Sequence, residues 1–249
     1  DPLWSRGLGD VYKRQECMST LTKILINPRR RQGRKLLTNP QAMHAAVAAS
    51  FPPDLDQSSG RILWRLDESA HHHALYVVGP EKPTASVIAE QAGWDTRPAQ
   101  SVEYDRLLGS LAKGQRWHFE LLANPTYSQS NGGKRGKVKA HVSVDHQLGW
   151  LYQRSERAGF KLAPRAQDEA SNAERDRWSV HEQTTIVERK SLDFRKGDSR
   201  RRVHIATARY RGTLEVSDPD ALRATLVNGI GRARGYGCGL LTLARPTGA

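Results

Sequence analysis

The chain has 249 residues, enough for one large domain or two domains of about 100 residues each. Lys and Arg number 39 against 26 acidic residues, and the net charge of +13 predicts a polyanionic partner. No apolar run approaches the ~18 residues that a membrane-spanning helix needs, so we expect no membrane partner.

The beginning of the chain differs in character from the rest. Residues 1–17 show no periodicity, and we expect them to be a non-native leader before Met18. Cys17 falls in that stretch, which leaves Cys238 as the other thiol. One thiol forms neither an internal disulfide nor a thiolate zinc site. We therefore expect a reducing cytoplasm, no metal site and no cofactor.

The first half of the chain predicts the element order β-α-β-β-α-β. Alternating apolar residues predict strands at 20–26, 61–67, 73–78 and 101–105. Asn39 and Pro40 are typical of a helix start, and the Ala-rich segment behind them predicts a helix to residue 51. A second helix is expected at 84–92, and the basic segment 29–35 is expected to be a loop.

The second half repeats this order. Strands are predicted at 117–123, 179–187, 203–216 and 240–243, and helices at 145–158 and from 219 to about 228. Residues 131–139 (NGGKRGKVK) predict a basic hairpin tip, and residues 164–177 a loop. The predicted fold class is α+β, with tandem ferredoxin-like (RRM-like, βαββαβ) domains at 18–112 and 113–249.

Residues 228–241 (NGIGRARGYGCGLL) combine closely spaced glycines with two arginines. Glycines let a backbone approach its partner closely, and arginines offer forked donors to phosphate. A helix–strand connection that needs tight turns is the structural alternative. The segment lacks the features of a Walker loop or a dinucleotide fingerprint. The candidate RNA-binding residues here are Gly229, Gly231, Arg232, Arg234, Gly235 and Gly237.

Three segments carry a resemblance to a known family. They are the opening strand with NPRRRQGRK and a helix containing MH, the ELLANPT strand with its basic hairpin, and the ending GIGRARGYGCGLLTLA. Together they resemble CasE, the family of CRISPR repeat endoribonucleases of type I-E Cascade, within the RAMP superfamily. The resemblance covers about residues 19–246.

The resemblance implies a metal-independent endoribonuclease that grips the hairpin of a CRISPR repeat. Such an enzyme cleaves pre-crRNA to mature crRNA, and the products carry 2′,3′-cyclic phosphate and 5′-OH ends. The implied partners are the repeat RNA and the other Cascade subunits. Outside that complex the protein is expected to be a monomer.

The resemblance also places the catalytic histidine of the family at His44. An imidazole can take or give a proton near neutral pH, which suits this role. The alternative is a histidine on the rim of a core helix. The family often carries a tyrosine three residues earlier, where this chain has Gln41, so a second acid–base residue is not assigned.

Basic residues elsewhere suit phosphates. Arg31, Arg34 and Lys35 precede the helix of His44, and a cation there would stabilise charge on the cleaved phosphate. The other candidates for contact with the RNA stem lie in the predicted loops and hairpins: Arg29, Lys134, Arg135, Lys137, Lys139, Arg200, Arg201 and Arg202. Solvated surface charge is the plain alternative for each of them.

Two rival functions remain open. One is a non-catalytic subunit that binds structured RNA with the same fold, which the glutamine at position 41 favours. The other is a two-histidine phosphodiesterase, because His141 begins an H-x-[ST] motif. That reaction needs a second motif, and HIAT at His204 has the wrong spacing.

Overall fold

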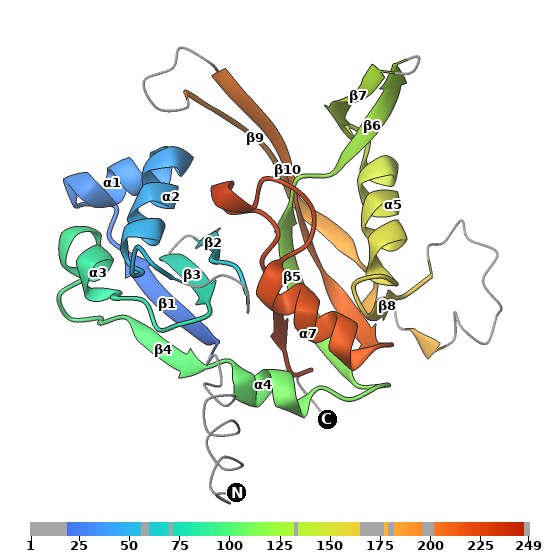
Figure 1. The fold of residues 1–249 in the computed structure, drawn as a ribbon, viewed down its shortest axis with the longest axis horizontal. Helices are drawn as coiled ribbons and strands as arrows, with labels where there is room; N and C mark the ends of the chain where they lie inside the picture. Colours follow the sequence, from blue (N-terminus) through green and yellow to red (C-terminus); the bar gives the residue numbers. More distant parts are fainter. Residues whose placement is uncertain are drawn as a thin grey trace, which may run out of the picture.

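The computed structural model describes residues 19–55, 60–69, 72–131, 134–164, 177–178, 182–195 and 202–246. Figure 1 shows two halves, each built from an antiparallel sheet with helices against it. Among the described residues, no helix has the length and hydrophobicity that crossing a lipid bilayer requires.

The first sheet has four strands in the order β2-β3-β1-β4. Their bounds are Thr20–Ile26 for β1, Leu63–Glu68 for β2, His73–Gly79 for β3 and Gln100–Glu103 for β4. Side chains of β1 alternate between buried and half-buried, as period-two patterning requires. The buried face packs against three helices: α1 (Arg31–Thr38), α2 (Pro40–Ala49) and α3 (Ser86–Ala92).

The start of α2 follows its sequence signals. Asn39 caps the helix, because its Oδ1 accepts hydrogen bonds from the backbone N–H groups of Gln41 at 3.0 Å and Ala42 at 3.2 Å. Pro40 occupies the first turn, where a missing N–H costs nothing. Both features confirm the predicted helix start. They also fix the direction in which α2 presents its side chains.

The prediction of a loop at 29–35 was wrong, because α1 begins at Arg31. The density of basic residues was interpreted as typical of a loop, but Arg and Lys are good helix formers. Leu36 supplies a buried apolar anchor for the helix. Gly33 sits so close to the end of β1 that a Cβ would lie 2.0 Å from the carbonyl oxygen of Asn27. Packing against β1 therefore stabilises a short helix that the charge pattern obscured.

The second sheet has the order β11-β5-β10-β8, with β9 also paired to β10. Its strands are β5 (Arg116–Ala123), β8 (Phe160–Leu162), β9 (Thr185–Arg195), β10 (Arg202–Val216) and β11 (Leu241–Ala244). Helices α5 (Val144–Ser155) and α7 (Pro219–Asn228) belong to this half. The tandem ferredoxin-like fold is confirmed. Strands β1 and β3 lie in the middle of the first sheet, and β5 and β10 lie in the middle of the second.

Some boundaries differ from the prediction. The strand expected at 179–187 begins only at Thr185 and runs on to Arg195. The short strand β8 and the helix α4 (Asp105–Ser110) were not predicted. The basic hairpin forms its own two-stranded sheet from β6 (Thr126–Asn131) and β7 (Lys134–Ala140). The proposed domain boundary near residue 112 lies between α4 and β5.

Two buried arginines join the halves. Arg65 of β2 donates to the carbonyl oxygens of Glu120 at 2.8 Å and Leu240 at 3.2 Å. Arg209 of β10 donates to Asp67 at 2.5 Å and to Glu120 at 2.7 Å. These bonds fix β2 of the first half against β5 and β10 of the second.

Candidate functional site

His44 lies where α2 meets the glycine-rich loop of the second half. Its neighbours Met43 and Val47 point into the core, whereas His44 is exposed. A Cβ at residue 235 would lie 3.5 Å from Cε1 and 3.6 Å from Nδ1 of the imidazole. The histidine ring therefore packs beside the backbone of Gly235, on the loop that the sequence singled out.

The loop holds this position through an unusual backbone. A short 3₁₀ turn at Arg234–Tyr236 is preceded by Ala233 with φ 58° and followed by Gly237 with φ 81°. A Cβ at Gly237 would lie 2.7 Å from Cζ3 of Trp64. Glycine at this position thus satisfies both the left-handed backbone and the close approach to the indole.

The other glycine candidates face the protein interior. A Cβ at Gly229 would lie 2.9 Å from the side chain of Leu63, and one at Gly231 would lie 2.8 Å from that of Trp150. Gly229 is itself buried. These contacts favour a packing role for both glycines, and they set the path of the loop towards Gly235.

Tyr236 is a site residue that sequence reasoning missed. Its ring centroid lies 6.2 Å from that of His44 and 4.7 Å from that of Phe194 at the end of β9. The signal was present, because an aromatic residue flanked by two glycines in RGYG is an unusual choice for a simple turn. The tyrosine brings an aromatic ring to the imidazole from the second half of the chain.

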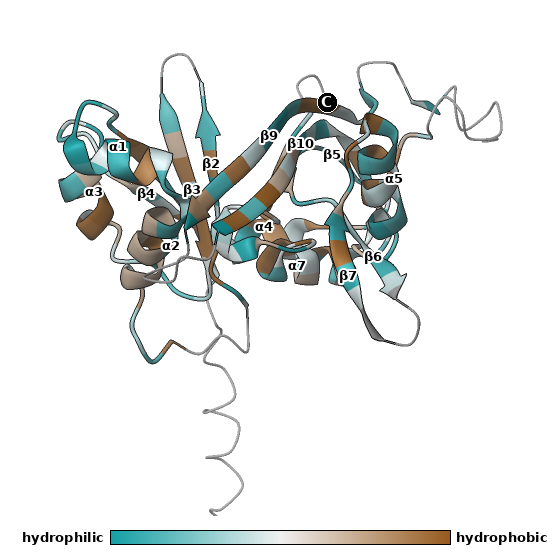
Figure 2. Cartoon of the chain, turned by 90° about the horizontal axis from the view of Figure 1, so that it is seen from above, coloured by the Kyte–Doolittle hydropathy of each residue, from teal (hydrophilic) through white to brown (hydrophobic). Residues whose placement is uncertain are grey.

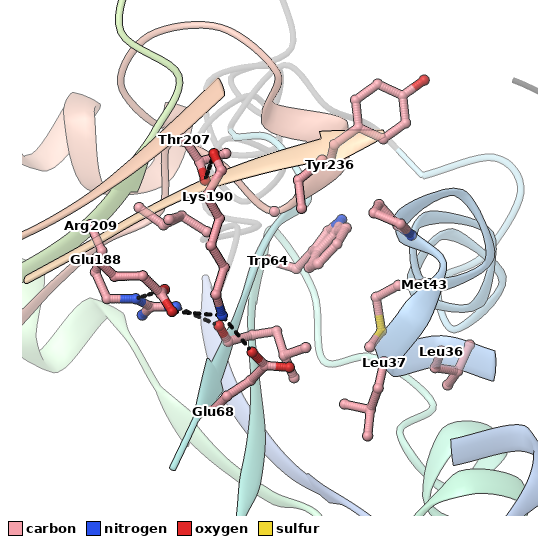
Figure 3. A pocket seen from close by; sticks show the side chains of 15 residues that line it. Leu36, Leu37, Met43, Trp64, Glu68, Glu188, Lys190, Thr207, Arg209 and Tyr236 are labelled. Carbon is pink, nitrogen blue, oxygen red and sulfur yellow. Dashed lines mark hydrogen bonds and ion pairs between the residues drawn. The ribbon is translucent and has the colours of Figure 1, made fainter. Parts of the chain in front are cut away.

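A cavity of about 230 Å³ adjoins these rings (Figure 3). On one side it is lined by apolar residues of α1 and α2, including Leu36, Leu37 and Met43. Trp64 and Tyr236 also line it. On the other side are charged residues of β2, β9 and β10: Glu68, Glu188, Lys190 and Arg209.

The charged side of this cavity is an ion-pair network. Lys190 Nζ lies 2.9 Å from Glu68 Oε2 and 2.6 Å from Glu188 Oε1. Burial alone would lower the pKa of Lys190, but its bonds to Glu188 and Glu68 outweigh burial and raise it. Burial would likewise raise the pKa of Glu188, but Lys190 and Arg209 lower it. Both side chains therefore stay charged at neutral pH. Sequence reasoning missed Lys190, because nothing in its segment distinguishes it from other strand charges.

The predicted phosphate-stabilising residues lie on α1, where Arg31, Arg34 and Lys35 are exposed. Arg34 donates to the carbonyl oxygen of Arg29 at 3.3 Å. Lys35 lines a separate cavity between α1, α2 and α3, together with Ala42 and Ala46. His44 projects from a different face of α2. Among the described contacts of His44, none is to these three cations.

Of the candidate residues for the RNA stem, those that the structure describes lie on two β ribbons, except Arg29, which lies in the turn before α1. Figure 1 shows the β6–β7 hairpin and the β9–β10 ribbon both extending from the body of the second half. Lys137 and Lys139 are exposed on β7, and Arg202 is exposed at the start of β10. Figure 2 shows hydrophobic and hydrophilic residues alternating along β9 and β10. Arg200, Arg201 and the side chains of Lys134 and Arg135 lie outside the described residues.

The two loop arginines differ in environment. Arg232 is exposed, whereas Arg234 is half-buried. Burial lowers the pKa of Arg234, and the nearby charge of Arg61 lowers it further. Arg232 is thus the loop cation that faces solvent. Arg234 supports the loop from within, since its Cγ approaches the backbone at Gly239.

His141 belongs to an aromatic cluster at the base of the β6–β7 hairpin. Its ring centroid lies 4.9 Å from that of Tyr127 and 5.7 Å from that of His146. His204 lies elsewhere and is paired with Asp193 at 2.7 Å. His204 is therefore not the histidine beside His141, as a two-histidine phosphodiesterase built on these two segments would require.

Within the described residues, no group of three or more His, Cys, Asp or Glu side chains is arranged to hold a metal ion. Cys238 is fully buried, and burial raises the pKa of its thiol to about 12. The thiol is therefore protonated at neutral pH.

Comparisons with known proteins place the chain in a family. A family described as "CRISPR associated protein" matches residues 21–245. The chain is 31% identical over 229 residues to the CRISPR-associated endoribonuclease Cse3 of Thermus thermophilus, covering 90% of this chain and 99% of that protein.

Solved structures agree with this assignment. A structure of Cse3 bound to a 19-nucleotide RNA matches with a TM-score of 0.71 and 29% identity, covering 91% of this chain and 99% of that one. Thermus thermophilus Cse3 bound to an RNA representing a pre-cleavage complex matches with a TM-score of 0.71 and 28% identity, with the same coverage. Cas6e of Escherichia coli, at 20% identity and a TM-score of 0.53, shares the fold and covers 91% of this chain and 100% of its own. The chain belongs to the Cse3/Cas6e family of CRISPR-associated endoribonucleases.

Proposed function

We propose that this chain binds the hairpin of a CRISPR repeat and cleaves pre-crRNA to mature crRNA. The observation that carries the proposal is the position of His44, whose imidazole packs beside the backbone of Gly235 and the ring of Tyr236. The family membership supports it, because the related Cse3 structures are complexes with RNA.

The proposed chemistry uses a nucleophile within the substrate. The 2′-OH of the ribose upstream of the cut attacks the adjacent phosphate, and the 5′-oxygen of the next nucleotide leaves. The products carry a 2′,3′-cyclic phosphate and a 5′-OH, and no metal ion is required. The protein orients the attack and handles the protons. His44 is the proton-transfer residue of this proposal.

The charge on the phosphate requires a cation near His44. Arg31 and Arg34 remain the proposed residues on α1, and the exposed Arg232 of the loop is a further one. Lys35 is the weaker choice, because it lines the cavity between α1, α2 and α3. The backbone of the loop at Gly235 and Gly237 would lie along the RNA near the cut.

The two ribbons supply the surface for the RNA stem. A-form RNA exposes its phosphates and shape rather than its base edges, so basic ribbons can follow it. We assign this role to the β6–β7 hairpin, to Arg29 and to the segment around Arg202. We also propose that the protein acts in the cytoplasm and that the other Cascade subunits are its partners. It would be a monomer outside that complex.

The decisive experiment incubates the protein with repeat hairpin RNAs in EDTA and maps both new ends. We expect one cut with a cyclic phosphate upstream. In His44→Ala the rate should fall about 10²–10⁴-fold while the affinity for RNA is retained. The matched control is His118→Ala. His118 lines a cavity on the other face of β2, where its Nδ1 forms a hydrogen bond with Thr213 Oγ1 at 2.9 Å. Its loss should leave the cleavage rate unchanged.

A non-catalytic RNA-binding subunit remains the alternative, favoured by Gln41 in place of the tyrosine common in the family. Under that alternative the wild type binds the hairpin but leaves it intact, and His44→Ala changes nothing. Replacing Lys137 and Lys139 by alanine should weaken RNA binding and reduce its salt dependence under either function. RNA recovered uncut from the wild type would therefore decide against cleavage.

A further inference from the structure

The cavity beside Tyr236 has features that the cleavage chemistry does not use. We propose that it receives one unpaired base from a nucleotide next to the cut, a binding site that rests on the proposed endoribonuclease function. Its volume of about 230 Å³ is below the ~300–1,000 Å³ of typical ligand pockets, which suits a single flat group.

The walls of the cavity suit the faces of a base. Trp64 is held beneath the loop at Gly237 and is only 4% exposed, so its indole is a rigid surface. Leu37 and Met43 line the cavity from α1 and α2 (Figure 3). Unstacked RNA bases bind to proteins through such contacts of their faces with aromatic and apolar side chains.

The charged side of the cavity suits the edge of a base. Lys190 has three N–H donors, of which two point to Glu68 and Glu188. Glu68 uses Oε2 for Lys190, and among the described residues no hydrogen bond occupies its Oε1. One donor and one acceptor therefore remain side by side. All four bases offer such a pair on one edge: O6 and N1–H in guanine, O4 and N3–H in uracil, N1 and the amino group in adenine, and N3 and the amino group in cytosine. A base can therefore bind both groups at once.

The position of the cavity connects it to the cut. Met43 and Pro40 of α2 line it, and His44 follows Met43 directly on the same helix. Tyr236 contacts His44 and also lines the cavity. A base in the cavity would thus belong to a nucleotide close to the phosphate at His44. Taking it out of the stack would hold the RNA chain in one register.

The test measures single-turnover cleavage and binding of a repeat hairpin RNA. Each nucleotide on either side of the cut is replaced in turn by an abasic nucleotide. In the wild type we expect one position at which the abasic RNA is bound or cut about tenfold to a hundredfold less well, as the loss of base stacking implies. In Leu37→Trp the indole fills the cavity. Binding and cleavage of intact RNA by this variant should then fall to the level that the wild type shows with the abasic RNA. The abasic change should cause no further loss in the variant.

Leu107→Trp is the matched control, because Leu107 is a half-buried leucine of α4 outside the cavity. It should respond to abasic RNAs as the wild type does. An abasic penalty of equal size in the wild type and in Leu37→Trp would overturn the base site and leave the endoribonuclease standing. A wild type that neither binds nor cuts the hairpin would overturn both. Normal cutting by Leu37→Trp with lost assembly of protein partners would assign the cavity to a protein side chain instead.

The identity of the base is tested by placing each of the four bases at the sensitive position. We expect the four bases to be cut at different rates, because guanine and uracil present the acceptor and the donor in the opposite order to adenine and cytosine. The base that is cut fastest names the occupant. Glu68→Gln should reduce these differences. Glu103→Gln, which alters an exposed glutamate paired with Arg106 at 2.8 Å, should not. Equal rates with all four bases would overturn the assignment of the charged side to the edge of a base.

Discussion

The ring of Tyr236 packs against the imidazole of His44, with 6.2 Å between the ring centroids and 58° between the ring planes. This contact joins the first half of the chain to the second at the proposed site of cleavage. Among the described residues, no hydrogen bond is formed by the hydroxyl of Tyr236, so the ring is the part of the side chain that contacts His44.

Replacing Tyr236 should therefore reveal a positioning role. We expect Tyr236→Ala to slow single-turnover cleavage about two- to tenfold, the range that one aromatic pair supplies. Tyr236→Phe keeps the ring and should keep both the rate and its pH profile. A phenylalanine variant as slow as the alanine variant would instead assign the hydroxyl to proton transfer.

Gly237 is a position at which the loop should tolerate a side chain poorly. Its φ of 81° and the approach of Trp64 to 2.7 Å of a Cβ both oppose a side chain. We expect Gly237→Ala to lower the free energy of unfolding by about 1–3 kcal/mol, measured by denaturant titration. The same variant should cut RNA more slowly, because the displaced loop carries Tyr236.

Gly109→Ala is the control for this substitution. Gly109 lies in α4, and a Cβ there would meet no atom within 4 Å. Because alanine favours a helix over glycine, we expect this variant to be unchanged or more stable by up to about 1 kcal/mol. Equal losses at Gly237 and Gly109 would argue against the strained loop.

Arg209 should contribute strongly to stability. It is 7% exposed and binds Asp67, Glu120 and Glu188. Arg209→Met would remove one cation from these three carboxylates, which keep ion pairs with Arg65, Arg211 and Lys190. We expect a loss of up to about 3–5 kcal/mol in the free energy of unfolding. Arg106→Met removes an exposed pair with Glu103 and should cost about 0–1 kcal/mol. A small loss at Arg209 would show that the halves do not depend on this network.

His141 predicts a pH dependence on the acid side of neutrality. Burial lowers its pKa below 6.5, and the charges of His146 and Arg154 lower it further. The unfolded chain then binds the proton more readily than the folded one. The contribution of His141 is therefore present above pH 6.5 and is lost as the pH falls through that value towards the folded pKa.

We expect the free energy of unfolding to fall between pH 7 and pH 5, and His141→Asn to reduce this fall. In His146→Asn, NMR titration should show the pKa of His141 moving up towards 6.5, because one repelling charge is gone. An unchanged pKa in that variant would mean that burial and Arg154 set the shift without His146.

The sequence predicted those parts of the fold that local patterns determine. Alternation defined β1 to the residue, and the Asn39-Pro40 and Asp218-Pro219 pairs marked both helix starts. Helix α1 was missed, because its stability comes from the fit of Gly33 against the end of β1. That contact depends on tertiary packing, which charge and spacing do not reveal.

The candidate site was predicted in part for the same reason. The segments of His44 and Gly235 were each recognisable, and the structure brings them together. Trp64, Lys190 and Tyr236 join the same region through three different strands and loops. No motif marks Trp64 or Lys190, since their neighbours in space are far away in sequence. Conversely, Lys35 was chosen for its position beside the helix, and the structure turns it to another face.

The contact between His44 and Gly235 has a consequence for any attempt to divide the chain. One half carries the imidazole and the other carries the loop that meets it, so neither half alone would form the proposed catalytic centre. Under the proposed function, a substitution that changes the angle between the halves would slow cleavage even where each half still folds.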